Sequence, residues 1–372
     1  MYTWQIITGE YAVGGVGDYT RRIALSLADS ADEVNVWAPM SKNGFPNDEG
    51  VLVHALPGRF GARALMILDH AISAADESVI LVQYVPHAFG FKAMNLPFCC
   101  WLSARRRCKI FVMFHEVAFE AASLHLRHSI LEVVTKVMAR LVAGAASRIF
   151  VSTSSWERML QPMLRRRLAI ESLPVPSNVD VVDDTEAIRE TRLSYVPGNA
   201  FLIGHFSSYP ENIQPYLCQA IPALLSDRRV GMVLIGRGSK ELRQVISARS
   251  DHALTRLHAT GELGSHEVSL HLSACDLMIQ PYPEGITTRR TSTMAAIAHR
   301  RPVVTTKGEL TEPIWSETAA VSLVPVDDIS NLAATVGHLL DDLGERERLG
   351  QAAFNLYRES FDLRHTVNTL RT

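Results

Sequence analysis

The sequence predicts an α/β protein with two doubly wound domains, each a parallel sheet covered by helices on both faces. Short apolar runs of strand length alternate with amphipathic segments of helix length along the whole chain. A proline-rich stretch followed by an acidic one interrupts this alternation at residues 172–184, after which it starts again. The length of 372 residues is too great for one ordinary core and suits two domains.

The first half of the chain contains six strand-like runs. They are Gln5–Thr8, Glu33–Ala38, Val51–Leu56, Val79–Tyr84, Ile110–His115 and Arg148–Ser152. After the first run come several glycines and then Tyr19–Ala28, whose apolar residues recur at helical spacing. A long amphipathic helix is expected over Ser129–Ala145. These elements predict an N-terminal domain over residues 1–178.

The second half repeats the pattern. Its strand-like runs are Phe201–Phe206, Met232–Ile235, Leu257–Thr260, Leu277–Gln280, Val303–Thr306 and Ala320–Val324. An apolar helix, Met294–Ala298, follows the fourth run. We expect a second domain over residues 179–350 and a final helix within residues 351–372. Because ligands of open α/β sheets bind at the carboxyl ends of the strands, we expect a binding cleft between the two domains.

Composition and charge exclude several classes of protein. A net charge of −2 gives no reason to expect a nucleic-acid partner. The five cysteines are odd in number and form no C-x-x-C pair, which argues against a disulfide framework or a zinc site. The chain shows neither a signal-peptide pattern nor an apolar stretch of ~18 residues. We therefore expect a cytoplasmic protein, either free or peripheral at the inner membrane.

The most informative motif is Pro-Glu-Gly-Ile-Thr-Thr-Arg-Arg-Thr-Ser over residues 283–292, directly after Leu277–Gln280. It leads into an apolar helix, whose N-terminus carries unpaired N–H groups and attracts anions. Arg289 and Arg290 add positive charge that suits a diphosphate, and one of them suffices because neighbouring helix residues point about 100° apart. The carboxylate of Glu284 suits sugar hydroxyls. The motif therefore predicts a site for a nucleotide sugar.

Further polar residues near this motif are candidates for the same ligand. The hydroxyls of Thr288, Thr291 and Ser292 either donate hydrogen bonds to phosphate or cap the helix, and the sequence leaves both interpretations open. Glu309 follows another strand of the second domain and is a candidate to accept ribose hydroxyls; a solvated carboxylate is the alternative.

The loop after the first strand is the second candidate region. Gly14 and Gly15 would let backbone N–H groups approach the donor phosphates, or would form only a tight turn. Asp18 would bind the acceptor or fix the loop; alternatively it is an acidic residue in a first helical turn. The loop differs from the dinucleotide fingerprint, because no acidic residue ends a second strand at the expected distance.

Two further strand ends carry polar residues on the acceptor side. His115 ends a strongly apolar strand and is followed by Glu116, and Gln83 and Tyr84 end the preceding strand. We expect these four residues to line the sugar and acceptor pocket, with a structural histidine and a plain loop as the alternatives.

Taken in order, the motifs resemble GT-B glycosyltransferases of the family 4 type. The resemblance rests on residues 14–22, 114–116, 151–154, 234–238, 280–285 and 301–306. It implies two Rossmann-like domains and a retaining glycosyltransferase of the kind used in polysaccharide biosynthesis. Such enzymes need neither a metal nor another cofactor and take a nucleoside diphosphate sugar as donor. The C-terminal domain holds this donor, the N-terminal domain holds a free or lipid-linked glycan acceptor, and the last helix, about Ala352–Arg371, crosses back to the N-terminal domain.

The resemblance also assigns roles at the reaction centre. Glu284 would contact a hydroxyl of the donor sugar, His115 would contact the transferred sugar, and Arg290 would stabilise the leaving diphosphate.

The chain departs from the family pattern in two places. Ser292 stands where the family commonly has a second Glu that binds the ribose, and residues 204–212 lack the usual Arg and Lys. The departures keep a second class open, namely a catalytically silent GT-B scaffold that binds nucleotide or glycan. An epimerase or phosphorylase of similar architecture is a third class, although no lysine for a pyridoxal cofactor lies in a recognisable motif.

Two basic runs suggest a membrane contact. Arg105–Lys109 follows the apolar stretch Leu96–Leu102, and Arg165–Arg167 lies further along the same domain. Apolar residues beside a cationic cluster can rest on an anionic bilayer, and an ordinary helix with a solvated end is the alternative.

Overall fold

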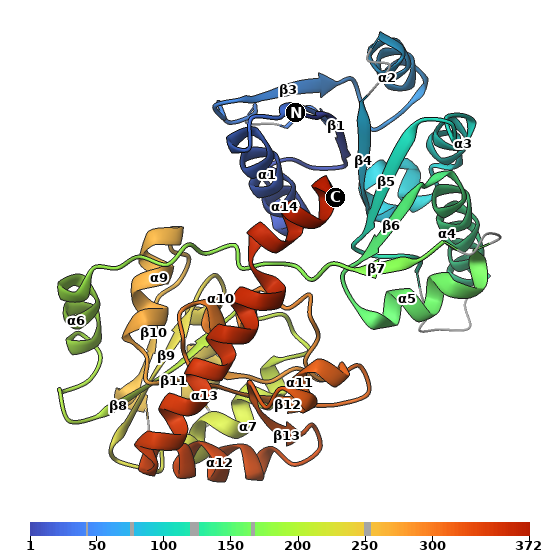
Figure 1. Cartoon of the computed structure of the whole chain (residues 1–372). Helices are drawn as coiled ribbons and strands as arrows, with labels where there is room; N and C mark the ends of the chain where they lie inside the picture. The colour runs from blue at the N-terminus through green and yellow to red at the C-terminus, as the bar shows by residue number, and fades with distance from the viewer. Residues whose placement is uncertain (42–43, 75–77, 120–125, 165–167, 249–253) are drawn as a thin grey trace. The chain divides into compact units, whose positions relative to one another are not determined.

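The computed structural model describes residues 1–41, 44–74, 78–119, 126–164, 168–248 and 254–372, which form two compact units (Figure 1). The first unit contains Met1–Pro174 and Leu363–Thr372, and the second contains Val175–Asp362. Each unit has its own hydrophobic core and its own parallel sheet, so the predicted α/β fold is confirmed. The chain leaves the first unit inside the proline-rich stretch, four residues before the boundary that we expected.

The first unit is built on a seven-stranded parallel sheet with the order β3-β2-β1-β4-β5-β6-β7. Its strands are β1 (Thr3–Thr8), β2 (Glu33–Pro39), β3 (Val51–Leu56), β4 (Val79–Tyr84), β5 (Lys109–Phe114), β6 (Arg148–Val151) and β7 (Ile170–Ser172). The first six coincide with predicted runs. β7 was not predicted, because three residues of mixed polarity show no periodicity; its pairing with β6 defines it.

The helices of this unit are α1 (Gly14–Asp29), α2 (Ala62–Ala74), α3 (Leu96–Ala104), α4 (Leu126–Ala145), α5 (Ser154–Leu160) and α14 (Leu363–Arg371). Helix α1 begins at Gly14 rather than at Tyr19, so the glycines form its first turn. Gly17 allows a close approach there, because a Cβ at this position would lie 3.2 Å from the backbone nitrogen of Ala12, which is a tight contact.

The second unit is built on a six-stranded parallel sheet with the order β10-β9-β8-β11-β12-β13. Its strands are β8 (Phe201–Phe206), β9 (Val230–Ile235), β10 (Leu257–Ala259), β11 (Leu277–Gln280), β12 (Val303–Lys307) and β13 (Ser322–Pro325). Its helices are α6 (Thr185–Leu193), α7 (Gln214–Leu224), α8 (Ser239–Ser247), α9 (Ser265–Ala274), α10 (Thr291–Ala298), α11 (Pro313–Glu317), α12 (Ile329–Asp341) and α13 (Leu343–Leu356).

Both sheets change direction beside their first strand. In the second unit the chain runs outward from β8 to β10 and then returns to build β11, β12 and β13 on the other side. In the first unit the same change occurs between β1 and β4. Such a switch point opens a crevice at the carboxyl ends of the two strands, where open α/β proteins bind their ligands. We therefore expect the ligand-binding residues of each unit to lie near its switch point.

The C-terminal segment is divided into three pieces where we expected one helix. Helix α13 is followed by a π-helical turn, Tyr357–Phe361, and Asp362 is extended, which ends the helix. Only α14 belongs to the first unit, where it packs against α1. The guanidinium of Arg371 lies 3.1 Å from the buried carboxylate of Asp32, which also accepts a hydrogen bond of 3.1 Å from the indole of Trp4. This ion pair anchors the end of the chain.

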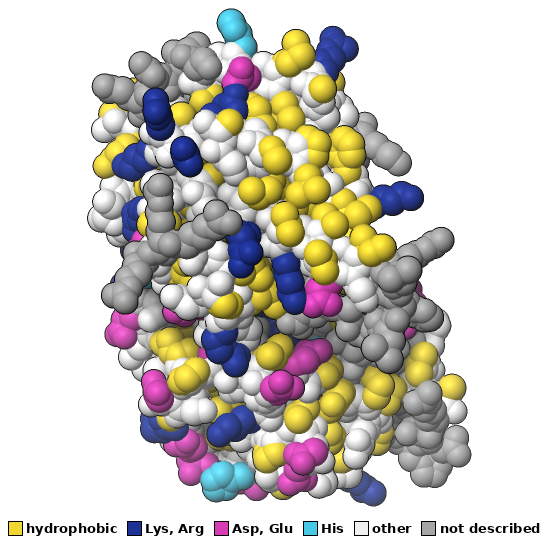
Figure 2. Space-filling view, turned by 90° about the vertical axis from the view of Figure 1, so that its right-hand side faces the viewer, with side chains coloured by type: hydrophobic (Ala, Val, Ile, Leu, Met, Phe, Trp, Pro, Cys, Tyr) yellow, Lys and Arg dark blue, Asp and Glu magenta, His cyan; other side chains and the backbone are white. Residues whose placement is uncertain are grey.

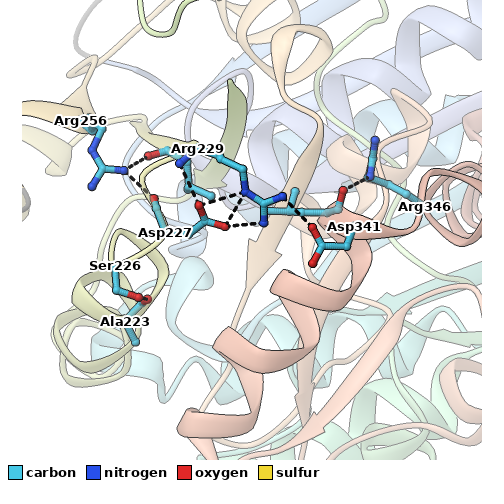
Figure 3. A network of polar contacts seen from close by, with 9 residues as sticks. Ala223, Ser226, Asp227, Arg229, Arg256, Asp341 and Arg346 are labelled. Carbon is cyan, nitrogen blue, oxygen red and sulfur yellow. Dashed lines mark hydrogen bonds and ion pairs between the residues drawn. The ribbon is translucent and has the colours of Figure 1, made fainter. Parts of the chain in front are cut away.

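A charged network stabilises the second sheet at the ends where its strands begin (Figure 3). Arg256 donates three hydrogen bonds of 2.5–2.6 Å to backbone carbonyls within residues 225–230. Arg229 pairs with Asp227 at 2.7 Å and with Asp341 of α12 at 2.8 Å. A hollow of about 340 Å³ between α7 and α12 lies at the same end. Because it is remote from the carboxyl ends of the strands, we assign this region to stability rather than to ligand binding.

Candidate functional site

The candidate site of the second unit lies in the loop between β11 and α10, at the switch point of its sheet. The loop is held by β12 and the segment after it: Ile286 donates its N–H to the carbonyl of Thr306 at 3.0 Å, and Leu310 donates its N–H to the carbonyl of Glu284 at 2.8 Å. Gly285 has a φ of +90°, and a Cβ there would lie 2.5 Å from the backbone nitrogen of Gly308. Only glycine fits, so the turn that presents Glu284 is fixed by its backbone.

The two central residues of the predicted site contact each other. Nη2 of Arg290 lies 3.1 Å from Oε2 of Glu284, and the guanidinium carbon lies 4.5 Å above the ring of Tyr282. Arg290 is the N-cap residue of α10. The side chains of Glu284 and Arg290 are 45% and 24% exposed. A solvent-accessible ion pair therefore stands at the N-terminus of a buried helix.

Tyr282, which the sequence analysis did not single out, supports this pair from below. Its side chain is 5% exposed, and its hydroxyl forms hydrogen bonds of 2.9 Å with Ser292 and 2.8 Å with Thr293. Its backbone N–H donates to the hydroxyl of Thr306 at 2.7 Å. Burial raises the pKa of the phenol, so it stays protonated. The ring is thus held in place and provides a fixed aromatic face on which the guanidinium of Arg290 stacks.

A buried carboxylate, Glu312, holds the turn before α10. It is 6% exposed and accepts hydrogen bonds from the N–H of Thr288 at 2.5 Å and from the hydroxyl of the same residue at 3.1 Å. Glu312 was not predicted from the sequence, because it lies five residues after the end of β12, directly before the proline that opens α11. The carboxylate predicted on this loop, as an acceptor of ribose hydroxyls, was Glu309, which is exposed.

Two expectations about this segment are wrong. Arg289 and Arg290 lie in a turn closed by a 3.2 Å hydrogen bond from Arg290 N–H to the Thr287 carbonyl, and α10 starts only at Thr291. The 100° spacing of helix residues therefore does not apply to them. The interpretation that Thr288, Thr291 and Ser292 cap α10 is also wrong, because the N-cap is Arg290 and no side chain caps the helix. A phosphate contact of these hydroxyls stays a prediction.

His205 lies close to the same switch point, at the carboxyl end of β8. It is fully buried, and within the described part of the chain neither ring nitrogen has a hydrogen-bond partner. Burial lowers the pKa of its imidazole to about 3, so the ring is neutral at physiological pH. His205 belongs to the segment in which the sequence analysis found no Arg or Lys. The structure therefore has the neutral imidazole of His205 in this segment, where a cationic side chain was looked for.

In the first unit, His115 and Gln83 come together at the ends of neighbouring strands. Nε2 of His115 lies 2.7 Å from Oε1 of Gln83, and the ring of Tyr19 packs edge-on against the imidazole at 4.9 Å. Burial lowers the pKa of His115 to about 3. At physiological pH this histidine is a neutral hydrogen-bonding group and carries no charge. Tyr84 is fully buried against Phe114, which favours its structural alternative.

The remaining candidates of this unit lie near the start of α1 and after β5. Gly14 and Gly15 are exposed in the first turn of α1. Asp18 is half-buried, and burial raises its pKa; it follows the first turn, so the first-turn interpretation is wrong. Glu116 lies 3.5 Å from Nδ1 of His87. The ligand contacts that we expect from these residues stay predictions.

The apolar stretch Leu96–Leu102 is partly buried. It lies in α3, and Phe98, Cys99 and Leu102 are buried in the core of the first unit. Arg105 stacks on Trp101 at 4.1 Å and pairs with Asp69. The burial of this part of the stretch favours the alternative of an ordinary helix with a solvated end, and a bilayer contact of the stretch stays a prediction. Arg165–Arg167 lies outside the described residues.

The described residues lack two further features. They contain no cluster of three or more His, Cys, Asp or Glu side chains that could bind a metal ion. None of their helices combines the length and the apolar character needed to span a bilayer.

Comparisons with known proteins agree with this architecture. Residues 199–342 match the family model "Glycosyl transferases group 1". No curated protein is significantly similar to the chain in sequence. A glycosyltransferase from Rickettsia africae shares the fold with a TM-score of 0.76 and 13% identity, over 99% of this chain and 96% of that one. Sucrose-phosphate synthase from Thermosynechococcus elongatus has a TM-score of 0.71 and 14% identity, over 100% and 97% of the two chains.

A third similar structure, HepE from Anabaena in complex with UDP and glucose, has a TM-score of 0.71 and 15% identity, over 100% of this chain and 98% of that one. These likenesses show the fold, and the family model covers most of the second unit, including the loop with Glu284 and Arg290. The chain therefore has the two-unit GT-B fold of these glycosyltransferases, and its second unit matches the group 1 glycosyl transferase family over residues 199–342.

Proposed function

We propose that the chain transfers a sugar from a nucleoside diphosphate sugar to a hydroxyl of a glycan, with retention of the anomeric configuration and without a metal ion. The observation that carries the proposal is the accessible pair of Glu284 and Arg290 at the N-terminus of α10, at the switch point of the second sheet. Two similar structures support the donor class by their names, HepE in complex with UDP-glucose and a UDP-forming trehalose-phosphate synthase.

In this proposal the second unit binds the donor. Arg290, with Arg289 beside it and the free N–H groups of α10, would bind the diphosphate. Glu284 would accept hydrogen bonds from hydroxyls of the sugar. The bond between the anomeric carbon and the diphosphate oxygen breaks as the acceptor oxygen bonds to that carbon on the same face. The leaving oxygen takes the acceptor proton, and the guanidinium stabilises its charge.

The first unit would bind the acceptor and complete the donor site. The neutral imidazole of His115 would contact the transferred sugar through a hydrogen bond, since its low pKa excludes a charge. Gly14 and Gly15 would offer backbone N–H groups to the donor phosphates. Asp18 and Glu116 would bind acceptor hydroxyls.

We further propose a lipid-linked acceptor and a peripheral contact with the cytoplasmic face of a membrane. On α4, Ile130, Val133 and Val137 are 44–61% exposed and lie three and four residues apart, so they share one face of the helix. Arg140 is exposed one turn further on, and Phe119, 49% exposed, donates its N–H to a hydroxyl in the middle of α4. Figure 2 shows apolar side chains gathered over this part of the first unit. An apolar helix face with a cation at its end suits an anionic bilayer.

A vesicle assay tests this contact. The wild type should sediment with vesicles containing anionic lipid, and the double variant Val133→Asp with Val137→Asp should not. Leu343→Asp is the matched control, because Leu343 is 58% exposed on α13 of the second unit. Equal sedimentation of the double variant and the control would refute the α4 surface.

The transferase itself is tested by nucleotide binding followed by turnover. One of UDP, GDP, ADP and TDP should raise the melting temperature of the wild type equally with and without EDTA. Its sugar conjugate should be turned over, and Arg290→Ala should lower kcat by about 10²–10³, the usual effect of removing a group that stabilises developing charge. Glu284→Ala should lower kcat/KM by about tenfold or more. Wild-type rates in both variants would refute the site assignment.

The scaffold alternative makes the opposite prediction, because a binding protein needs no stabilisation of a transition state. Binding of a nucleotide or glycan without turnover, over a broad panel of donors and acceptors, would favour it. Ser292 in place of a second Glu is the observation behind this alternative.

A further inference from the structure

We propose that Glu284 and the donor diphosphate compete for Arg290: the diphosphate replaces Glu284 as the counter-ion of the guanidinium, and the released carboxylate then accepts the hydroxyls of the transferred sugar. This inference rests on the proposed function and assigns an order to its first step. Recognition of the diphosphate would thereby make the sugar contact of Glu284 available.

The contact between the two side chains is of a kind that exchanges easily. A single guanidinium nitrogen, Nη2, faces a single carboxylate oxygen at 3.1 Å, and both side chains reach solvent. Accessible one-point pairs contribute little to stability because water and salt screen them. A diphosphate carries more negative charge and several oxygens, so it can form the two-point contact that a guanidinium prefers.

Arg290 can change its partner without moving. Its guanidinium has five N–H donors. Within the described part of the chain one nitrogen pairs with Glu284, and Nε has no hydrogen-bond partner. The ring of Tyr282 supports the group at 4.5 Å and is itself held by Ser292 and Thr293. The backbone of Glu284 is fixed by the loop, so the exchange needs only a rotation of the glutamate side chain.

Competition has a consequence that a simple binding contact lacks. In Glu284→Gln no anion competes for Arg290, so the nucleoside diphosphate should bind about 3–10-fold more tightly, which is about 0.7–1.4 kcal/mol. The same variant should turn over the sugar conjugate more slowly, because an amide is a weaker acceptor for sugar hydroxyls. Affinity for the diphosphate and turnover therefore move in opposite directions.

The experiment is a double-mutant cycle measured by calorimetric titration. The ligand is whichever of UDP, GDP, ADP and TDP binds the wild type most tightly, and the proteins are the wild type, Glu284→Gln, Arg290→Gln and the double variant. Glu347→Gln is the matched control, because Glu347 is an exposed carboxylate on α13 of the same unit. The nucleoside monophosphate serves as the second ligand, and its gain in affinity should be smaller.

Each outcome decides one point. Tighter binding of the diphosphate to Glu284→Gln, together with loss of this gain in the Arg290→Gln background, supports the exchange. Unchanged or weaker binding to Glu284→Gln overturns it and leaves the proposed function intact. A gain that persists without Arg290 also overturns it, because removal of a repulsive charge would then suffice. If the wild type binds none of the four nucleotides, the proposed function itself fails.

Discussion

Replacing Glu312 by alanine should destabilise the second unit by removing the buried acceptor of its key turn. The carboxylate accepts both the N–H and the hydroxyl of Thr288, and the two residues are 6% and 4% exposed. In Glu312→Ala both donors of Thr288 stay buried and lose their acceptor. The turn that positions Arg289 and Arg290 would then lose this buried side-chain support.

The size of the loss follows from these two hydrogen bonds. A buried donor without a partner costs about 1–3 kcal/mol, and the hydroxyl can recover part of this by rotating. We therefore expect a loss of about 2–4 kcal/mol in the free energy of unfolding. For a unit of this size, 1 kcal/mol corresponds to about 2–4 °C, so the melting temperature should fall by about 4–16 °C.

Differential scanning calorimetry of Glu312→Ala measures this shift in the transition of the second unit. Glu312→Gln keeps one acceptor oxygen and should lose less, and Thr288→Val, which keeps the backbone hydrogen bond, should lose least. Nucleotide affinity should fall in the same order, because the turn carries both arginines. A melting temperature of Glu312→Ala within about 1 °C of the wild type would refute the view that this carboxylate holds the turn.

Three further predictions follow from buried groups. Burial lowers the pKa of His205 to about 3 in the folded protein. Between about pH 6.5 and pH 3 this histidine is therefore protonated in the unfolded state and neutral in the folded state. Stability should therefore decrease through this window, by about 2 kcal/mol from pH 7 to pH 5, and His205→Leu should show a smaller slope in urea unfolding; an equal slope refutes the assignment. Gly285→Ala should weaken nucleotide binding and lower the melting temperature, because its Cβ would lie 2.5 Å from Gly308; wild-type values for both would refute the steric argument. Arg256→Leu should cost about 2–4 kcal/mol in urea unfolding by removing three hydrogen bonds from the guanidinium to backbone carbonyls, whereas the exposed Arg229→Leu should change little; equal losses would refute this distinction.

Most of the fold was predictable because buried strands and amphipathic helices have different periods. The runs that became β1–β6 and β8–β13 are apolar enough to stand out against the helices between them. The exceptions have local reasons. β7 is too short to show a period, and the start of α1 was misplaced because glycines suggest a loop until the surrounding chain constrains them. The break at Asp362 likewise depends on packing that no local pattern records.

The site was predictable as far as its residues are close in sequence. Glu284 and Arg290 belong to one turn, so their proximity follows from the motif itself. Glu312 comes from another loop, and only the pairing of β11 with β12 brings it to Thr288. Tyr282 was overlooked because an aromatic residue after a strand is usually part of the core. Its role in supporting Arg290 depends on the orientation of the ring, whose face lies against the guanidinium.

The structure divides the motif into groups that are free to exchange partners and groups that are not. Thr288 is bonded to a buried carboxylate, and Ser292 to a buried phenol, so a ligand that took either hydroxyl would remove one hydrogen bond from a buried group. Glu284 and Arg290 share one accessible contact, which a ligand can replace without that penalty. Ser292, which stands where the family pattern has its second Glu, is bonded through its hydroxyl to Tyr282 and so helps to support Arg290. The departure from the family pattern and the support of the guanidinium are thus one structural feature.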